Sequence, residues 1–394
     1  MKTLFKNANI VLPDKVVSGD VLVENGKITK IGKINETAES TVDLSGNYLC
    51  PGFVDIHNHG GAGYEFIDAT EEAYLAALRA HLAGGTTTIV PTFSSYPLSM
   101  ILSAVEVFND LKEREAEISG IPHLAGLHME GPNFAAAQAG AQDPSIIHPP
   151  QKEEYEAILS ATPYVKRWSV APELEGALEF GTYLSERGIN ASIGHSDANT
   201  ETTLEAVKYG YDTVTHVYSG CSLVHRNGAF REGGVVEGAF LADGLTVEII
   251  ADGAHLPKEL LQLIYKIKGP DKIAMVTDCI RPGGQNFPDG TVLPYDKQKG
   301  IDITIERGVA LLPGGKAFAG SLATTSHLVR IMVNLAEIPI YEVCRMMSLN
   351  PAKIIKMDDT IGSIEIGKNA DFTILDKDLQ VEKVVLSGNI AYER

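Results

Sequence analysis

Residues 51–61 read Pro51-Gly52-Phe53-Val54-Asp55-Ile56-His57-Asn58-His59-Gly60-Gly61, and this stretch decides the fold. The apolar run at 53–56 predicts a short buried strand, and His57 and His59 follow it directly. Side chains two residues apart on an extended chain point to the same face, so both imidazoles can bind one ion. The stretch therefore predicts a strand that ends in a metal site.

Similar apolar or β-branched runs continue along the chain and alternate with amphipathic helical segments such as 71–83 and 200–209. The eight candidate strands are residues 53–56, 87–93, 124–128, 167–171, 189–193, 213–217, 247–251 and 273–277. Eight strands with intervening helices are the count of a (β/α)₈ TIM barrel, an α/β fold. A doubly wound open sheet is the competing architecture.

Polar side chains follow the ends of these strands. They are Glu130 and Glu173 after the third and fourth strands, His195 and His216 after the fifth and sixth, Asp252 and His255 after the seventh, and Asp278 after the eighth. Barrel enzymes carry their chemistry at the C-terminal ends of the strands, so these side chains would converge on one mouth. An open sheet would not bring the first and last strands together, so convergence favours the barrel.

Imidazole and carboxylate ligands suit a divalent metal that acts on water, with zinc as the first choice and iron or manganese as alternatives. Asp278 beside such an ion could accept a proton from water and return it to a leaving amine. Each histidine could instead be a buried core residue, and Asp278 could instead cap a turn or helix.

Both ends of the chain are rich in short alternating runs broken by Gly, Asn and Asp, and the pair Asn25-Gly26 predicts a tight hairpin. We therefore predict three segments: 1–50 and 351–394 as two parts of a small β domain, and 51–350 as the metal-dependent catalytic barrel.

The formal net charge of -18 repels nucleic-acid phosphates and anionic lipid, so neither is expected as a partner. The N-terminus lacks the apolar core of a signal peptide, and no run approaches the roughly 20 apolar residues of a membrane span. Cys50, Cys221, Cys279 and Cys344 form no CxxC pair. We expect reduced thiols and a cytoplasmic protein.

Several stretches together resemble the amidohydrolase superfamily and, within it, the N-acetylglucosamine-6-phosphate deacetylases. They are PGFVDIHNHGG, GLHMEGP, GAQDP, SIGHSDA, THVYSG, EIIADGAHL, MVTDC, AGS and NPAKIIKMDDTIGSIEIGKNADFTILD, in the family's order and over nearly the whole chain. The resemblance implies a barrel flanked by a small β-sandwich built from both termini, a homodimer, and an amino sugar as substrate.

Carried over residue by residue, the resemblance makes Glu130, His195 and His216 the ligands of the principal metal and Asp278 the catalytic acid/base. Some relatives replace the first two histidines and hold one ion. Here His57 and His59 are both present, so the resemblance allows one or two ions per subunit. It assigns substrate contacts to Ala141, Gln142, Ser219, Gly220, Arg231, His255, Phe318, Ala319 and Gly320, with Arg231 holding the sugar phosphate.

The sequence departs from the family pattern at Ser219-Gly220, where relatives usually carry Asn-Ala, and at Gln142, where some relatives carry His. Three hypotheses follow. The protein deacetylates N-acetylglucosamine 6-phosphate to glucosamine 6-phosphate and acetate, or it deacetylates an unphosphorylated or galacto-configured amino sugar. The third is a non-catalytic barrel that only binds its ligand, which predicts missing metal ligands, whereas every ligand position is filled.

Overall fold

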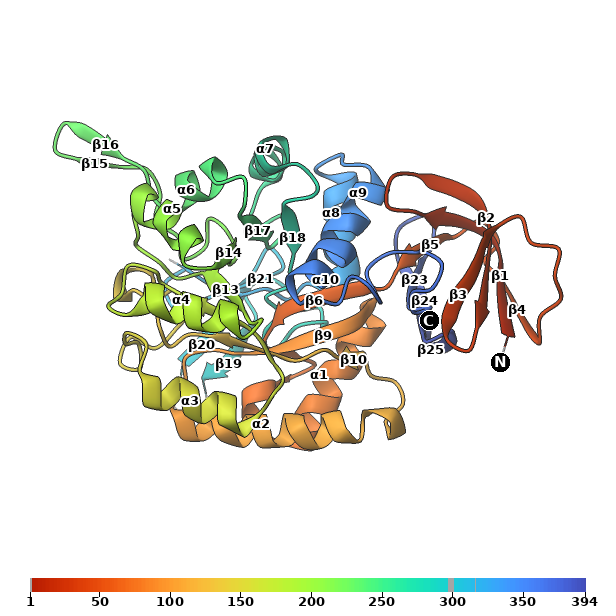
Figure 1. The fold of residues 1–394 in the computed structure, drawn as a ribbon, viewed down its shortest axis with the longest axis horizontal. Helices are drawn as coiled ribbons and strands as arrows, with labels where there is room; N and C mark the ends of the chain where they lie inside the picture. Colours follow the sequence, from red (N-terminus) through yellow and green to blue (C-terminus); the bar gives the residue numbers. More distant parts are fainter. Residues whose placement is uncertain (1, 297–300, 316) are drawn as a thin grey trace.

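Eight parallel strands form the centre of the computed structural model, which describes residues 2–296, 301–315 and 317–394 (Figure 1). They pair in chain order as β6 (Phe53–Asn58), β9 (Thr86–Phe93), β11 (Leu127–Glu130), β12 (Val165–Val170), β13 (Asn190–Ile193), β14 (Tyr211–Val214), β17 (Thr246–Ile249) and β18 (Ile273–Met275). A short strand, β10 (His123–Leu124), also pairs with β9. Each of the eight barrel strands lies within a few residues of one of the eight strands expected from the sequence.

The first and last of these strands meet at their C-terminal ends. The backbone N–H of Asp278 donates to the carbonyl of His57 at 2.9 Å, and the N–H of His59 donates to the carbonyl of Cys279 at 2.7 Å. Such contacts join the two edges of the sheet into a nearly closed barrel. The (β/α)₈ architecture is thus confirmed, and the open doubly wound sheet is not the fold.

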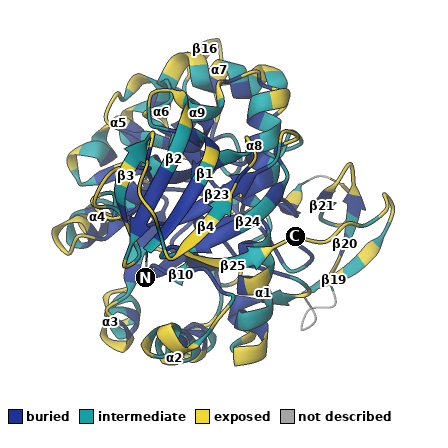
Figure 2. Cartoon of the chain, turned by 90° about the vertical axis from the view of Figure 1, so that its right-hand side faces the viewer, coloured by how far each residue is buried: buried dark blue, intermediate teal, exposed yellow. Residues whose placement is uncertain are grey.

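Helices surround the barrel, with their exposed faces outward (Figure 2). They are α1 (Glu71–Ala83), α2 (Leu98–Glu113), α3 (Lys152–Ala161), α4 (Ala177–Glu186), α5 (Thr200–Lys208), α6 (Val235–Leu241), α7 (Lys258–Lys268), α8 (Thr325–Asn334), α9 (Ile340–Cys344) and α10 (Asn350–Ile354). A π-helical turn at Arg345–Leu349 joins the last two. The predicted helix at 71–83 matches α1, and 200–209 extends one residue beyond α5.

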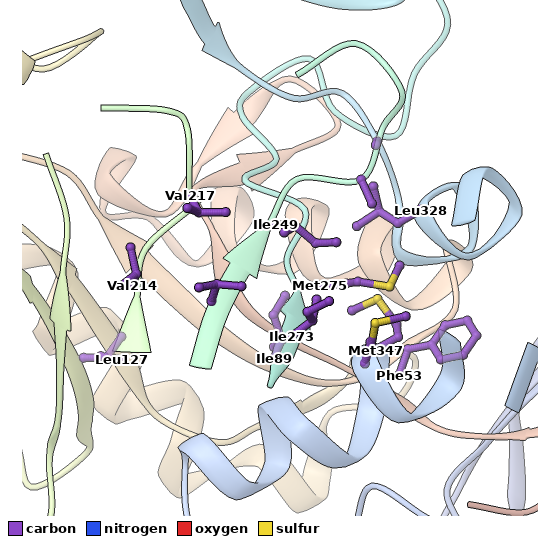
Figure 3. Packing of buried hydrophobic residues seen from close by; sticks show 14 of the residues in the cluster. Phe53, Ile89, Leu127, Val214, Val217, Ile249, Ile273, Met275, Leu328 and Met347 are labelled. Carbon is purple, nitrogen blue, oxygen red and sulfur yellow. The ribbon is translucent and has the colours of Figure 1, made fainter. Parts of the chain in front are cut away.

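The main core lies between the strands and this layer of helices (Figure 3). Leu127 and Val214 lie on barrel strands, and Met275 lies near Met347 of the π-helical turn, all of them buried. Parallel strands covered by helices are buried on both faces, which explains why they appear in the sequence as continuous apolar runs.

The small sheet draws strands from both ends of the chain and also contains both termini (Figure 1). Its strand order is β25 (Asn389–Glu393), β24 (Val381–Leu386), β23 (Phe372–Leu375), β5 (Tyr48–Pro51), β1 (Lys2–Val11), β2 (Val16–Glu24) and β3 (Lys27–Gly32), with β4 (Ser40–Asp43) also pairing with β1. Asn25 and Gly26 join β2 to β3 with positive φ angles of 50° and 76°, as the predicted hairpin requires. The segment boundaries at 50 and 350 stay predictions.

Two insertions at the barrel mouth were missed by the sequence analysis. The hairpin of β15 (His225–Asn227) and β16 (Phe230–Glu232) projects from the barrel, at the upper left of Figure 1. A four-stranded antiparallel sheet follows β18 and consists of β19 (Val292–Asp296), β20 (Ile301–Glu306), β21 (Val309–Leu311) and β22 (Phe318–Gly320). Within the described residues, no helix has the length and apolar character needed to cross a membrane.

Candidate active site

Four imidazoles surround the carboxylate of Glu130, at the C-terminal end of β11. The Nε2 atoms of His57, His195 and His216 lie 3.0–3.3 Å from its Oε1, and Nε2 of His59 lies 3.3 Å from its Oε2. Asp278 Oδ1 lies 3.1 Å from Nε2 of His59. The strand-end side chains of the first, third, fifth, sixth and eighth strands therefore converge, as the barrel predicted.

These side chains form two groups with the spacing of metal ligands. One group is His57, His59 and Glu130, and the other is Glu130, His195 and His216, so that Glu130 belongs to both. All five are buried. Each group could hold one ion, and a shared carboxylate is the geometry of a bridge between two ions.

A second hydrogen bond orients each imidazole by its other nitrogen. The Nδ1 of His195 lies 2.8 Å from the carbonyl of Gln138, and that of His216 lies 3.0 Å from the carbonyl of Ser219. The Nδ1 of His59 lies 3.1 Å from Ser94 Oγ. A carbonyl partner at Nδ1 fixes the proton there and leaves the Nε2 lone pair free, which is how metal-binding histidines are commonly prepared.

Three of these residues adopt backbone conformations that non-glycine residues seldom adopt. The φ angles of His195, His216 and Asp278 are 45°, 26° and 48°. A left-handed conformation costs on the order of 1–3 kcal/mol and persists where the surrounding structure enforces it. At the end of β14 this turn also explains why the strand stops at Val214, although the sequence predicts it to reach 217.

The electrostatics of the cluster keep its carboxylates ionised. Burial alone would raise the pKa of Glu130, but the charge of His57 and the contacts with His195 and His216 lower it well below its usual range. Burial likewise opposes ionisation of Asp278, and the hydrogen bond from His59 together with neighbouring imidazole charge lowers its pKa. Both carboxylates are thus held ionised in a buried place, where positive charge must balance them.

A cavity of about 320 Å³ opens over this cluster. Beside His59, Glu130, His195, His216 and Asp278 it is lined by most of the residues that the family resemblance assigns to substrate: Ala141, Gln142, Ser219, Gly220, His255, Phe318, Ala319 and Gly320. His57 lies beneath them, fully buried. Tyr218 and Tyr295 also belong to this lining, and neither was predicted from the sequence.

Two polar side chains at the mouth have partners that the sequence did not indicate. Gln142 donates from Nε2 to Glu130 Oε2 at 2.9 Å and accepts from the N–H of Ser95 at 2.7 Å, so it supports the carboxylate. Glu173 does not line the cavity, because it accepts hydrogen bonds from Ser196 Oγ and the N–H of Asp197. Convergence of the strand-end residues on this cavity therefore fails for Glu173 after the fourth strand and for Asp252 after the seventh.

Arg231 is also absent from the lining of this cavity. It lies on β16 of the projecting hairpin and is exposed, as are His225 and Arg226 on the paired strand. His255 does reach the cavity, and Asp252 Oδ2 holds its Nδ1 at 2.7 Å.

A charged pair that was not predicted from the sequence lies beneath His57. Glu248, on β17, lies 3.4 Å from His57 Nδ1 through its Oε2 and forms an ion pair with Arg167 of β12. Both side chains are fully buried. A charged residue inside an otherwise apolar predicted strand was the available signal, because such a residue is buried only when it is paired.

Comparisons with known proteins agree with this geometry. A family model described as the amidohydrolase family matches residues 48–391. An N-acetylglucosamine-6-phosphate deacetylase of Lysinibacillus sphaericus is 31% identical over 94% of this chain and 92% of its own. An N-acetylgalactosamine-6-phosphate deacetylase of Escherichia coli O157:H7 is 30% identical over 92% of each chain.

A solved structure with the same fold shows a relative with its ligand. It is a mutant of N-acetyl-D-glucosamine-6-phosphate deacetylase from Mycobacterium smegmatis, in complex with N-acetyl-D-glucosamine-6-phosphate. The TM-score is 0.87 at 26% identity, and the match covers 99% of both chains. The chain therefore belongs to the amidohydrolase family and, within it, to the family of N-acetylglucosamine-6-phosphate deacetylases.

Proposed function

We propose that this protein hydrolyses the acetamide of N-acetylglucosamine 6-phosphate and releases glucosamine 6-phosphate and acetate. The observation that carries the proposal is the cluster around Glu130, where four imidazole Nε2 atoms meet one carboxylate and Asp278 stands beside them at the floor of a cavity. The relatives that share nearly the full length of this chain are named for the same reaction class.

The donor set fits a divalent cation. Nε2 of His57 is buried without a hydrogen-bond partner, and the nearby carboxylates are held ionised. We assign the principal ion to Glu130, His195 and His216, and a second ion to His57 and His59 with Glu130 between them. Zinc is the first choice for this nitrogen-rich set, with iron or manganese as alternatives. When bound, such an ion supplies Lewis-acid chemistry at the amide carbonyl and makes water more acidic.

The protein's own residues supply the proton transfer. Asp278 is ionised and lies in the cavity wall, so its carboxylate accepts the proton of the attacking water. The same carboxyl group then gives the proton to the amine as the C–N bond breaks. His255 is held by Asp252 and points into the cavity, where it positions the sugar or the amide oxygen.

We assign the sugar contacts to Ala141, Gln142, Ser219, Gly220, Phe318, Ala319 and Gly320, which line the cavity, and the phosphate contact to Arg231. Arg231 is exposed on the projecting hairpin beside Phe230, which is 79% exposed. The hairpin thus carries an exposed aromatic side chain next to the arginine that we assign to the phosphate. This combination fits a hairpin that docks on a second copy of the chain. We therefore propose a homodimer in which Arg231 serves the neighbouring subunit's cavity.

We place the enzyme in the cytoplasm. The cysteines Cys50, Cys221, Cys279 and Cys344 are all free and buried, as suits a reducing compartment.

A second substrate deserves the same test, because Ser219-Gly220 replaces the usual pair in the cavity wall and one relative is named for N-acetylgalactosamine 6-phosphate. Residues in this wall are placed to distinguish the configuration of a sugar. The alternative is a deacetylase of the galacto-configured or unphosphorylated amino sugar.

The experiment measures acetate release by the metal-loaded protein from N-acetylglucosamine and N-acetylgalactosamine, each with and without the 6-phosphate. We expect the highest kcat/KM for N-acetylglucosamine 6-phosphate, and we expect Arg231→Ala to raise KM for phosphorylated sugars alone. A preference for the galacto sugar, or indifference to phosphate, would favour the alternative. No acetate from any of the four would refute both.

A further inference from the structure

A second cavity, of about 530 Å³, lies between α1, α8, the inserted sheet and the last strands of the chain. Among the described residues, its charged lining consists of Arg307, Arg330, Arg394 and Asp252, and His327 lies beside them. Three arginines against one carboxylate contrast with the formal net charge of -18 for the chain. A locally positive cavity in an acidic protein is suited to an anionic ligand.

Arg330, on α8, is the arginine on which this positive charge depends most. Its half-buried guanidinium donates to Gln380 Oε1 at 3.3 Å and to the carbonyl of Leu379 at 3.5 Å, and it lies 3.1 Å from Nδ1 of His327. Within the described parts of the chain, no carboxylate lies within ion-pair distance of it. Burial lowers the pKa of Arg330, because the charged form loses water there. The carboxylate of Asp376 opposes part of this shift from beyond ion-pair distance. The described hydrogen-bond partners of Arg330 are all neutral, so an anion in the cavity could pair with it directly.

The other two arginines differ from Arg330 in their surroundings. Arg394 forms ion pairs with Asp376 and Glu382, and Arg307 is largely exposed with its guanidinium 3.9 Å from Glu306. The charge of Arg394 is therefore balanced by two carboxylates and that of Arg307 lies in solvent, so Arg330 is the one of the three without a carboxylate within ion-pair distance among the described residues.

A short chain of side chains connects this cavity to the catalytic one. Arg330 contacts His327, and the backbone and carboxylate of Asp252 lie close enough to the His327 ring to oppose the lowering of its pKa by burial. The side chain of Asp252 holds His255, which lines the catalytic cavity. The linings of the two cavities have no residue in common, so the second cavity is a separate site with a defined connection.

We propose that this cavity is a second anion site, which takes the phosphate group of a small molecule at Arg330 and influences substrate binding through His327 and Asp252. A cluster of guanidinium groups matches the charge and the several acceptor oxygens of a phosphate better than those of a carboxylate. The volume is that of a site for a small organic molecule. The proposal does not depend on which amino sugar is the substrate.

The test is a calorimetric titration of the metal-loaded enzyme with inorganic phosphate, glucose 6-phosphate and acetate in parallel. We expect Arg330→Gln to remove one phosphate site per chain or to weaken it about tenfold, as the loss of a charge-assisted hydrogen bond does. Arg231→Gln should leave this site intact. The matched control is Arg187→Gln, since Arg187 is an exposed arginine on the barrel surface that lines neither cavity.

A second measurement reports the connection between the cavities. Phosphate should change KM for the substrate in the wild type and have a smaller effect in Arg330→Gln. Identical isotherms for the wild type and Arg330→Gln would overturn the site, and acetate that binds as tightly as phosphate would overturn the ligand class. Tight binding of glucose 6-phosphate beyond that of inorganic phosphate would identify a sugar phosphate as the ligand. If Arg330→Gln does not fold, Arg330→Lys decides, because it keeps a positive charge and loses the planar guanidinium: we expect weaker phosphate binding, and binding as tight as in the wild type would overturn the proposal.

Discussion

The carboxylate of Glu248 forms an ion pair with the guanidinium of Arg167 inside the barrel, where both side chains are fully buried. Arg167 also donates to the carbonyl of Ile56 at 3.1 Å, and Glu248 reaches His57 Nδ1 at 3.4 Å. The pair thus joins the fourth and seventh strands to the first, directly below the metal-ligand cluster. Because desolvation offsets much of the attraction in a buried ion pair, stability alone does not explain it, whereas its contact with His57 does.

We expect Arg167→Met to destabilise the protein by about 3–5 kcal/mol, because it leaves the Glu248 carboxylate buried without its cation. Urea unfolding of the metal-free protein measures this. Arg167→Met combined with Glu248→Leu should recover part of the loss, since no charge then remains unpaired. Arg114→Ala, which removes an exposed ion pair with Glu71 and Asp110, is the control and should change little. If Arg167→Met unfolds with the same free energy as the wild type, the expectation is wrong.

Metal content should separate the two groups of ligands that share Glu130. We expect the His57→Asn, His59→Asn double variant to lose one equivalent of metal and to retain the ion at His195 and His216. Loss of His195 should instead weaken the principal ion. Elemental analysis by mass spectrometry after dialysis against zinc measures the stoichiometry, and His225→Asn on the exposed hairpin is the control. If the wild type holds one ion per chain and the double variant holds the same, there is no second site at His57 and His59.

Asp278→Asn should lower kcat by about a hundred- to ten-thousand-fold, because the amide cannot accept the proton of water. Substrate KM and metal content should change much less, since Asp278 belongs to neither of the two groups that have the spacing of metal ligands. Steady-state kinetics with the preferred sugar measures the effect. Asp243→Asn removes an exposed carboxylate and serves as the control. Retention of more than about a tenth of kcat in Asp278→Asn would exclude the proposed proton transfer.

Much of the barrel was predictable because it depends on local pattern. Buried parallel strands are short apolar runs, and polar residues at their ends appear directly after those runs, so the sequence located Glu130, His195 and Asp278. The inserted sheet was missed, although 301–306 alternates between Ile and polar residues as a half-buried strand does. The ion pair of Arg167 with Glu248 depends on how distant strands are aligned across the barrel, which no local pattern contains.

The exposed hairpin permits a direct test of the proposed homodimer. Phe230→Asp places a charge where a docked hairpin would be buried, so we expect it to shift the protein toward monomer and to raise KM for the phosphorylated sugar. Light scattering after size-exclusion chromatography measures the mass. Leu241, which is 67% exposed on α6, is a control position for Asp substitution. A dimer that survives Phe230→Asp with unchanged KM would place the interface elsewhere.

His123 joins the barrel to the small sheet through a pH-dependent contact. Its Nδ1 lies 3.2 Å from Glu115 Oε1, and its Nε2 lies 3.5 Å from Asp371 Oδ1, just before β23. Burial alone would lower the pKa of His123, but the ion pair with Asp371 and the hydrogen bond with Glu115 raise it to about 10. The unfolded chain has the ordinary value of about 6.5. The contribution to stability is therefore complete below about pH 6.5 and disappears as the pH rises through about 10.

We expect His123→Gln to lower the free energy of unfolding at pH 6 and to have less effect at each step toward pH 10. Urea denaturation of both proteins at pH 6, 8 and 10 measures the difference between their free energies of unfolding. Groups that titrate alike in the two proteins contribute equally to both values and cancel in this difference. His225→Gln is the control, because His225 is exposed on the hairpin and far from the small sheet (Figure 1). A destabilisation that stays constant from pH 6 to pH 10 would mean that His123 contributes by packing and not by its charge.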